Sequence, residues 1–316
     1  MQYRKFGNTG VEVSALGFGC MRFPVNEDKT INEEKAIAMV RHAIDNGVNY
    51  VDTAYPYHQG TSELVVGKAL KDGYREKVYL ADKMPVWLLE TEDDFDKYLD
   101  EQLKKLDTDH IDFYLLHALS RERYEEKVKK LNLTKKLEEA KAAGKIRYIG
   151  FSFHDSLDLF KEIIDSYDGW DFCQIQYNYI NLTHQAGTEG LKYAASKGLG
   201  VVIMEPLLGG KLANLAPHVA EVFPEGKSHV EYALDFLWDK PEVSLLLSGM
   251  TEPEQVEANL EYASRSHVGM VTEEEKGRLR KSQKDLRRNG PCELHQMRLL
   301  HAVSLWPEYS GAVCCI

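Results

Sequence analysis

Three stretches of the sequence end in side chains that could take part in moving a proton. The first stretch ends in Asp52, and Tyr57 follows it in the next loop. Two later apolar runs end in Lys83 and in His117. An acid at the end of a strand with a tyrosine just beyond it is a plausible arrangement for proton transfer. Each residue alone also fits a structural role, such as a turn cap or a packed ring, so the prediction depends on their combination.

These side chains meet only if the segments that carry them run in parallel. Short β-prone segments alternate regularly with helical segments along the chain, which predicts an α/β protein with a parallel sheet. Eight such β-prone segments favour a closed (β/α)8 TIM barrel, in which the carboxyl ends of all strands converge on one face. No GxGxxG follows an early strand, so a Rossmann domain is disfavoured. The expected strands are 16–20, 48–54, 78–83, 111–117, 146–151, 172–177, 200–204 and 243–247, with helices near 32–45, 62–71, 93–107, 133–143, 155–166, 187–197 and 229–239.

A hairpin and a helical extension are expected on either side of the barrel sequence. The segment 3–15 carries turn residues at positions 7–10, and as an N-terminal β-hairpin it could plug the amino-terminal mouth. We expect residues 1–265 to form the barrel domain. We expect residues 266–316 to form a C-terminal helical extension and an atypical tail, with a helix near 272–288.

Composition excludes several classes of protein. The formal net charge of -11 argues against nucleic acid and anionic membranes as partners. The first residues do not resemble a targeting segment, and no apolar run reaches membrane-spanning length. The five cysteines suggest no disulfide framework. The default expectation is a cytoplasmic enzyme, with an oligomeric state that the sequence leaves open.

The motif Asp52-Thr53-Ala54-x-x-Tyr57, with Lys83 and His117 at matching intervals, resembles the catalytic tetrad of the aldo-keto reductase family. The resemblance runs from about residue 16 to residue 260. It implies an NAD(P)H-dependent reductase for a small aldehyde or ketone. Tyr57 would donate the proton, Lys83 would favour the phenolate, Asp52 would hold the lysine, and His117 would orient the substrate oxygen.

The resemblance also implies contacts with a nicotinamide cofactor, NADP or NAD. Ser152 matches the first residue of a family Ser-Asn pair, but Phe153 replaces the amide. Met204 stands where the family often has an aromatic residue that stacks on the nicotinamide, and methionine is a softer platform. The glycine-rich loop 207–212 would wrap the pyrophosphate with backbone amides. The full expected set is Gly19, Cys20, Met21, Asp52, Ser152, Gln174, Met204, Pro206, Leu207, Gly209, Lys211, Gly249, Gln255 and Asn259.

The adenosine end departs most from the family pattern. Family members often grip a 2′-phosphate with a Lys-Ser pair and an arginine, and Gly249, Met250 and Gln255 stand at those positions. Glutamine cannot replace the charged fork of arginine. We therefore expect weak discrimination between NADP and NAD. Candidate walls of the substrate pocket are aromatic loop residues: Tyr55, Trp87 and Tyr179.

Two other functions fit the same residues. A nucleotide-binding regulatory module of low turnover, like the potassium-channel β subunits, shares this fold and tetrad. A barrel coupled to an iron–sulfur electron-transfer tail is the second alternative. The resemblance to a bacterial ferredoxin-tailed subgroup rests on the runs 203–207 and 248–250.

The residues after Pro291 do not carry the cysteine motif of that subgroup. Back-translated with permitted codons from Cys292 and shifted forward by one nucleotide, they read V-S-C-T-R-C-G-Y-C-M-P-C-P, a run of closely spaced thiols typical of cluster binding. We therefore interpret this tail as an out-of-frame version of a cluster-binding segment; a divergent native tail is the alternative. With Cys292, Cys314 and Cys315 so far apart, we expect no iron–sulfur cluster and no other metal in this chain.

Overall fold

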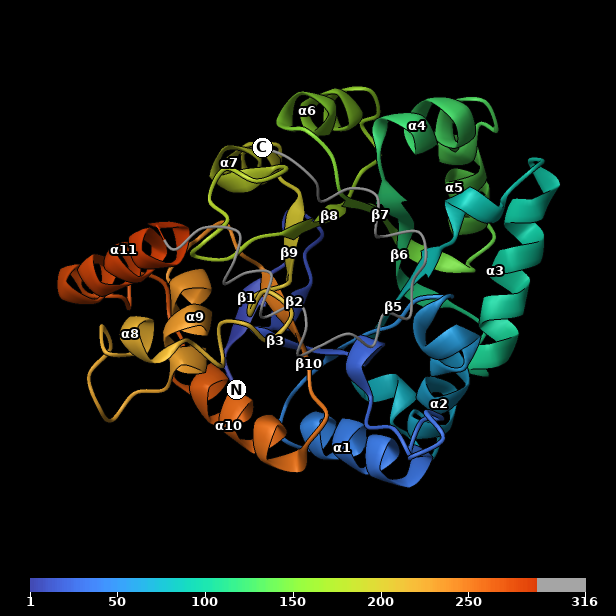
Figure 1. Cartoon of the computed structure of the whole chain (residues 1–316). Helices are drawn as coiled ribbons and strands as arrows, with labels where there is room; N and C mark the ends of the chain where they lie inside the picture. The colour runs from blue at the N-terminus through green and yellow to red at the C-terminus, as the bar shows by residue number, and fades with distance from the viewer. Residues whose placement is uncertain (289–316) are drawn as a thin grey trace.

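Eight parallel strands close into a barrel in this computed structural model, which describes residues 1–288. The strand order around the barrel is β10-β3-β4-β5-β6-β7-β8-β9, so each strand pairs with its neighbours in the sequence and the last closes on the first. This confirms the predicted (β/α)8 barrel (Figure 1). The strands are β3 (Leu16–Gly19), β4 (Tyr50–Asp52), β5 (Tyr79–Met84), β6 (Ile111–Leu119), β7 (Ile146–Phe153), β8 (Phe172–Gln176), β9 (Gly200–Met204) and β10 (Leu245–Gly249).

Helices surround the barrel because each buries one apolar stripe against the strands. In α6 the buried residues are Leu159, Phe160, Ile163 and Ile164, at the spacing of a single helix face. The longer helices around the barrel are α1 (Glu33–Asp45), α2 (Ser62–Ala69), α3 (Asp93–Leu106), α5 (Leu133–Ala142), α6 (Leu157–Asp165), α7 (Gly187–Ser196), α9 (His229–Trp238) and α10 (Pro253–Ser264). Shorter helices lie in the loops: α4 (Arg121–Arg123), α8 (Pro217–Ala220), and the turns η1 (Cys20–Arg22), η2 (Tyr57–Gly60), η3 (Arg75–Lys77), η4 (Val86–Leu88) and η5 (Tyr124–Lys129).

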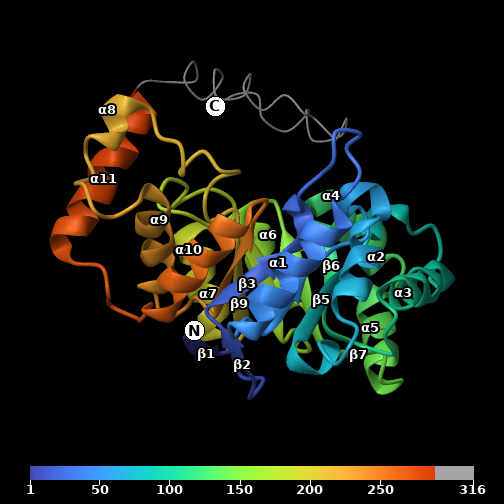
Figure 2. The ribbon, with the colours of Figure 1, turned by 90° about the horizontal axis from the view of Figure 1, so that it is seen from below.

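The predicted hairpin is present and covers the amino-terminal mouth of the barrel. It consists of β1 (Tyr3–Lys5) paired with β2 (Glu12–Ser14). Its turn places the ring of Phe6 inside the barrel, with centroids 4.6 Å from Phe113 and 5.5 Å from Phe172. Figure 2 shows the hairpin at one end of the barrel and the loop that carries α8 toward the other. The amino-terminal end is thus filled by side chains, which leaves the carboxyl end for a site.

Several strand boundaries differ from the prediction, most clearly those of the second and the last barrel strand. The strand expected over 48–54 is only β4, three residues long, and the strand expected over 243–247 lies two residues later. Ser248 and Gly249 belong to β10 because they pair with Phe18 and Gly19 of β3. Partner strands, rather than the local apolar run, therefore decide where β10 ends.

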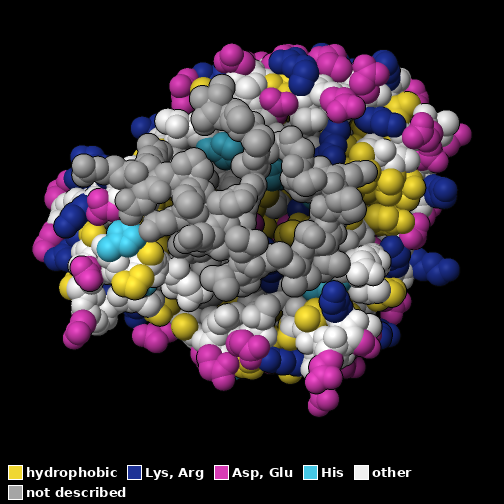
Figure 3. Space-filling view, viewed as in Figure 1, with side chains coloured by type: hydrophobic (Ala, Val, Ile, Leu, Met, Phe, Trp, Pro, Cys, Tyr) yellow, Lys and Arg dark blue, Asp and Glu magenta, His cyan; other side chains and the backbone are white. Residues whose placement is uncertain are grey.

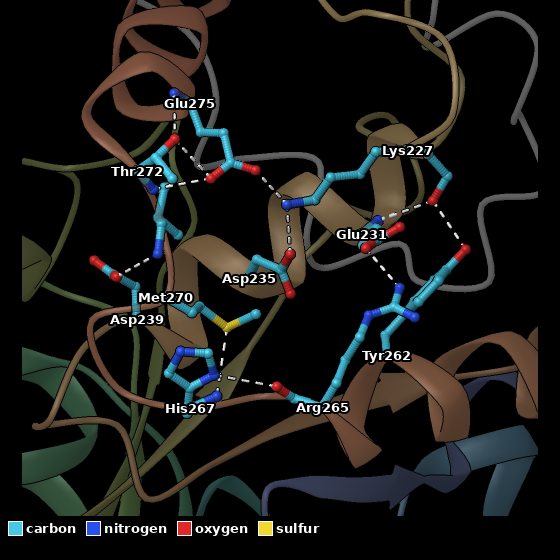
Figure 4. A network of polar contacts seen from close by, with 12 residues as sticks. Lys227, Glu231, Asp235, Asp239, Tyr262, Arg265, His267, Met270, Thr272 and Glu275 are labelled. Atoms are coloured by element: carbon cyan, nitrogen blue, oxygen red, sulfur yellow. Dashed lines mark hydrogen bonds and ion pairs between the residues drawn. The ribbon is translucent and has the colours of Figure 1, made fainter.

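The helix expected near 272–288 is α11 (Glu273–Arg288), and charged and apolar contacts tie it to the barrel. Lys227 Nζ lies 2.7 Å from Asp235 Oδ2 on α9 and 2.6 Å from Glu275 Oε1 on α11, so one ammonium joins both helices (Figure 4). Leu279 of α11 is buried in the same apolar cluster as Tyr179. The extension therefore packs on the barrel as part of the same body.

Candidate active site

A buried ion pair lies at the carboxyl ends of two adjacent strands. Asp52 is the last residue of β4, and Lys83 lies near the end of β5, which pairs with β4. The Lys83 Nζ is 2.7 Å from Asp52 Oδ1 and donates a second hydrogen bond of 2.7 Å to the carbonyl of Thr53. Lys83 has no exposed surface and Asp52 is 2% exposed. A lysine so buried requires a charged partner, which Asp52 supplies.

Burial and charge act in opposite directions on this pair. Burial by itself would lower the pKa of Lys83, but Asp52 and Tyr57 outweigh it, and the pKa is raised. Burial raises the pKa of the Asp52 carboxyl, although the Lys83 ammonium opposes the rise. With a direct contact and a second acceptor at Thr53, we assign the ammonium–carboxylate form at neutral pH. A fixed positive charge therefore lies at the carboxyl end of β5.

Tyr57 lies over this ammonium, and His117 lies beside Tyr57. Lys83 Nζ is 5.1 Å from the centroid of the Tyr57 ring, and the Tyr57 and His117 centroids are 6.2 Å apart with the rings nearly perpendicular. Tyr57 begins η2, in which His58 and Gln59 take positive φ values of 49° and 58°. This left-handed turn was not predicted from the sequence. It brings the phenol back over the barrel.

His117 is neutral at physiological pH. Burial, with further contributions from Lys83, His154 and Arg123, lowers the pKa of His117 well below its usual value. Its Nδ1 is buried without a hydrogen-bond partner among the described residues. A neutral imidazole can donate one hydrogen bond to a substrate oxygen but is a poor source of a proton.

Comparison with known proteins agrees with this geometry. The model of the aldo/keto reductase family matches residues 15–276. The chain belongs to the aldo/keto reductase family. Among its relatives, L-galactose dehydrogenase of Arabidopsis thaliana is 30% identical over 292 residues, covering 82% of this chain and 87% of that protein. An uncharacterised oxidoreductase of Bacillus subtilis (strain 168), YrpG, is 32% identical over 236 residues, covering 68% of this chain and 69% of that protein.

Solved structures of the family show the same barrel. The holo form of the aldo-keto reductase AKR11C1 from Bacillus halodurans superposes with a TM-score of 0.74 at 27% sequence identity, covering 89% of this chain and 96% of that one. Hence oxidoreductase membership rests on sequence and structure together. The ferredoxin-tailed subgroup is not shown by these comparisons, and the tail after Pro291 lies outside the described residues.

In this reductase, polar side chains outside the barrel support the lysine strand. Gln102 of α3 donates a hydrogen bond of 3.0 Å to the carbonyl of Lys83 and one of 2.8 Å to Asp82 Oδ2. Its side-chain oxygen accepts a hydrogen bond from the hydroxyl of Tyr114. Asp82 is fully buried; burial and the adjacent Glu63 raise its pKa well above the usual range. Sequence analysis missed this network. Its only signal was polar residues inside otherwise apolar segments.

The nicotinamide side of the predicted cofactor site contains groups that fit an amide. Gln174 of β8 is 2% exposed, and its Oε1 has no hydrogen-bond partner among the described residues. Its Nε2 lies 3.7 Å from Met204 Sδ on β9, so these two predicted contacts are adjacent. The Ser152 hydroxyl accepts from the Ala118 amide, which leaves its own proton to donate. An orphaned acceptor beside a free donor matches the carboxamide of a nicotinamide.

The predicted pyrophosphate loop has backbone geometry that only small residues adopt readily. Gly209 and Gly210 have φ values of 65° and 89°, in the left-handed region. A Cβ on Gly249 would lie 2.7 Å from Arg22 Cγ, and one on Gly209 would lie 3.9 Å from Arg22 Nη2. The Arg22 side chain thus extends from the end of β10 toward this loop. The same loop carries three other predicted contacts, Pro206, Leu207 and Lys211. Sequence analysis did not select Arg22, because a single arginine in a turn carries no pattern.

At the adenosine end, two predicted contacts have structural partners. Gln255 forms a capping box at the start of α10: its Oε1 accepts from Thr251 at 2.8 Å and from the Glu252 amide at 3.3 Å. Asn259 is buried and donates 3.1 Å to Ser248 Oγ. These side chains therefore stabilise the helix and strand that would border an adenosine, whether or not they contact it.

The predicted cofactor contacts at the end of β3 and just after it differ in exposure. Met21 is 46% exposed, whereas Cys20 is fully buried, and burial raises the pKa of its thiol well above the usual range. The Cys20 side chain therefore belongs to the core, and the predicted cofactor contact at this position would be made by its backbone. Gly19 stays at the carboxyl end of β3, where it pairs with Gly249.

Of the three predicted substrate contacts, Trp87 alone packs on the tetrad. Its ring centroid lies 5.2 Å from that of His117. Tyr55 turns toward α3, where its hydroxyl donates to Glu101 and its ring lies under Lys105. Tyr179 is 3% exposed and packs between α9 and α11, so its place in the substrate pocket stays a prediction without support from these contacts. Aromatic loop residues can fill a satellite core as readily as a site.

Three further observations concern metal ligands, helix hydropathy and surface charge in the described residues. No group of three or more metal-ligating side chains within residues 1–288 could hold a metal ion. In the same range no helix is long and apolar enough to cross a membrane. On the face shown in Figure 3, acidic and basic side chains alternate around the rim without a single basic patch. Cys292, Cys314 and Cys315 lie outside the described residues.

Proposed function

We propose that this aldo/keto reductase reduces an aldehyde or ketone to an alcohol, with Tyr57 as the proton donor. The observation that carries the proposal is the buried Lys83–Asp52 pair directly beneath the Tyr57 ring, beside a neutral His117. A nicotinamide bound near Gln174 and Ser152 would supply a hydride to the carbonyl carbon. The chain's own residues would handle the carbonyl oxygen and its proton.

Each residue has a separate task in this mechanism. His117 would donate a hydrogen bond to the carbonyl oxygen and hold it near Tyr57, while Trp87 packs against the imidazole and fixes its plane. The phenol would give its proton to the oxygen as negative charge develops there. The Lys83 ammonium favours the resulting phenolate, and Asp52 keeps the ammonium in place. Water would then return a proton to Tyr57.

A steady-state screen tests the proposal. A panel of aldehydes and ketones is supplied with NADPH and with NADH, and the corresponding alcohols are supplied with the oxidised nucleotides. Turnover of at least one carbonyl compound supports the proposal. Nucleotide binding without turnover of any substrate in either direction would favour a regulatory module instead.

Cofactor preference is expected to be weak. The positions aligned with the family's phosphate-gripping cations are Gly249, Met250 and Gln255, and Gln255 is occupied in capping α10. We expect the dissociation constants of NADPH and NADH to differ by less than about a hundredfold, or ~2.7 kcal/mol. Fluorescence titration of each nucleotide measures this directly, and a larger preference for NADPH would refute it.

We further propose that no iron–sulfur cluster binds this chain and that the residues after Pro291 arise from a frame change. The purified protein is then expected to be colourless and to contain no iron. A brown protein containing iron would overturn the first statement. A natural gene encoding residues 292–316 in an intact frame would overturn the second.

A further inference from the structure

We propose that the substrate carries an oxyanion, a carboxylate or a phosphate, and that Arg123 binds it. This inference rests on the proposed carbonyl reduction and names the class of carbonyl compound. Arg123 ends α4, the short helix that follows β6, the strand that carries His117. It is therefore held close to the tetrad by the chain itself.

The Trp87 ring connects Arg123 to His117, with the indole and imidazole planes tilted by 56°. The Arg123 guanidinium carbon lies 4.9 Å from the centroid of the Trp87 ring, and that ring lies 5.2 Å from the His117 ring. The guanidinium is thus separated from the imidazole by a single indole. A substrate whose carbonyl oxygen reaches His117 can place a second group beside Arg123 several bonds away.

A backbone irregularity fixes the guanidinium at this place. Ala118 has a φ of 54°, where β6 shifts register against β7. Its amide donates a hydrogen bond to Ser152 Oγ, and its carbonyl accepts a hydrogen bond of 2.8 Å from Arg123 Nη1. One of the five guanidinium protons is thereby used, which orients the planar group and leaves other donors available.

Within the described part of the chain, no acidic side chain forms an ion pair with Arg123, although the chain has a net charge of -11. Arg121, on the same short helix, pairs with Glu162 at 2.6 Å and with Glu125 at 3.5 Å. An arginine without an acid in so acidic a chain, next to the reacting groups, is the residue type that binds planar oxyanions in two-pronged fashion.

The nearest ionisable neighbours do not compensate this charge. Burial, and then the Arg123 charge itself, lower the pKa of His154 to about 4, so this imidazole is neutral. Gln185 Nε2 lies 3.4 Å from His154 Nδ1 and is also uncharged. The field of Arg123 reaches His117 as well, where it adds to the lowering of its pKa. An anionic substrate group would therefore meet an uncompensated positive charge.

A matched pair of aldehydes tests the inference. The full chain is assayed with 4-carboxybenzaldehyde and with its neutral methyl ester, methyl 4-formylbenzoate. The measured quantity is kcat/KM for the acid divided by kcat/KM for the ester. Because the charge of Arg123 would be hydrogen-bonded to the substrate, we expect this ratio to be about 10- to 100-fold higher in the native chain than in Arg123→Met. Arg121→Met, which removes an arginine from the same helix, should leave the ratio unchanged.

Outcomes of this assay separate binding from a structural role. If Arg123 only braces the bulge at Ala118, Arg123→Met lowers kcat/KM equally for acid and ester, and the inference is wrong. An unchanged ratio in Arg123→Met also overturns it. Glyceraldehyde 3-phosphate and glyceraldehyde form a second pair, and a preference that depends on Arg123 in one pair alone identifies the oxyanion as carboxylate or phosphate.

A binding measurement keeps the inference separate from the proposed reaction. Calorimetric titration of benzoate and of benzamide into the nucleotide-loaded chain requires no turnover. We expect benzoate to bind more tightly than benzamide, with the difference lost in Arg123→Met and kept in Arg121→Met. If no aldehyde is reduced but this difference is found, the proposed function fails and the oxyanion site stands; equal binding of both probes removes the site.

Discussion

Tyr57→Phe is expected to lower kcat by about 10²- to 10⁴-fold while nucleotide affinity stays near that of the native chain. The phenol is the only tetrad group able to give a proton at neutral pH, because His117 is neutral and the ammonium of Lys83 is engaged with Asp52 and Thr53. All predicted cofactor contacts except Asp52 lie on other strands and loops. Single-turnover kinetics and nucleotide titration measure the two effects separately.

The matched control for this variant is Tyr193→Phe. Tyr193 lies on α7, and its hydroxyl donates to Asp165 at the surface. Removing that hydroxyl should leave kcat unchanged. A Tyr57→Phe enzyme that keeps most of its kcat would mean that another group supplies the proton, and the mechanism proposed above would fail.

Lys83→Met is expected to reduce kcat by at least about 100-fold, since the phenolate loses the charge that stabilises it. The substitution also leaves the buried Asp52 carboxylate without its cation, so the carboxyl should take up a proton on folding. Methionine fills a similar volume, which limits the loss of packing. Steady-state kinetics at fixed pH measures the activity, and circular dichroism with thermal unfolding checks the fold.

A surface lysine provides the comparison for Lys83. Lys68 on α2 pairs with Glu33, and both side chains are about half exposed. Lys68→Met should change neither kcat nor the unfolding temperature appreciably, because exposed ion pairs contribute little. Full activity in a folded Lys83→Met enzyme would show that the ammonium does not assist Tyr57.

The sequence allowed three of the proposed catalytic groups to be placed on one face of the barrel, because Asp52, Lys83 and His117 lie at or near the carboxyl ends of strands. Parallel strands in a barrel bring their carboxyl ends to one face whatever the loops between them do. Asp52, Lys83 and His117 therefore needed only the correct strand assignment to be placed together. The hairpin before the first strand was predictable for a similar reason, since its turn residues and spacing are local signals.

Residues with roles set by distant neighbours were not predictable in this way. Tyr179 was expected at the site and packs under α11, because its partners Phe236 and Ser282 come from segments more than fifty residues away. Gln102 and Arg22 were overlooked, since a glutamine on a helix and an arginine in a turn have no periodicity that marks them. Gln255 caps its own helix, which is a local role. The prediction for this position considered only the arginine that binds phosphate in other family members.

By itself, the sequence determined the barrel and its N-terminal hairpin, because hydrophobic periodicity and turn residues are local signals. The tetrad is what the resemblance to the family implies, and it stays a proposal. Tertiary structure alone decided how the groups act. The burial that lowers the pKa of His117, the position of the Tyr57 ring over Lys83, and the contact of Arg123 with Trp87 all bring together segments distant in sequence. Desolvation and charge are properties of the space around a group, which forms only when those segments pack together.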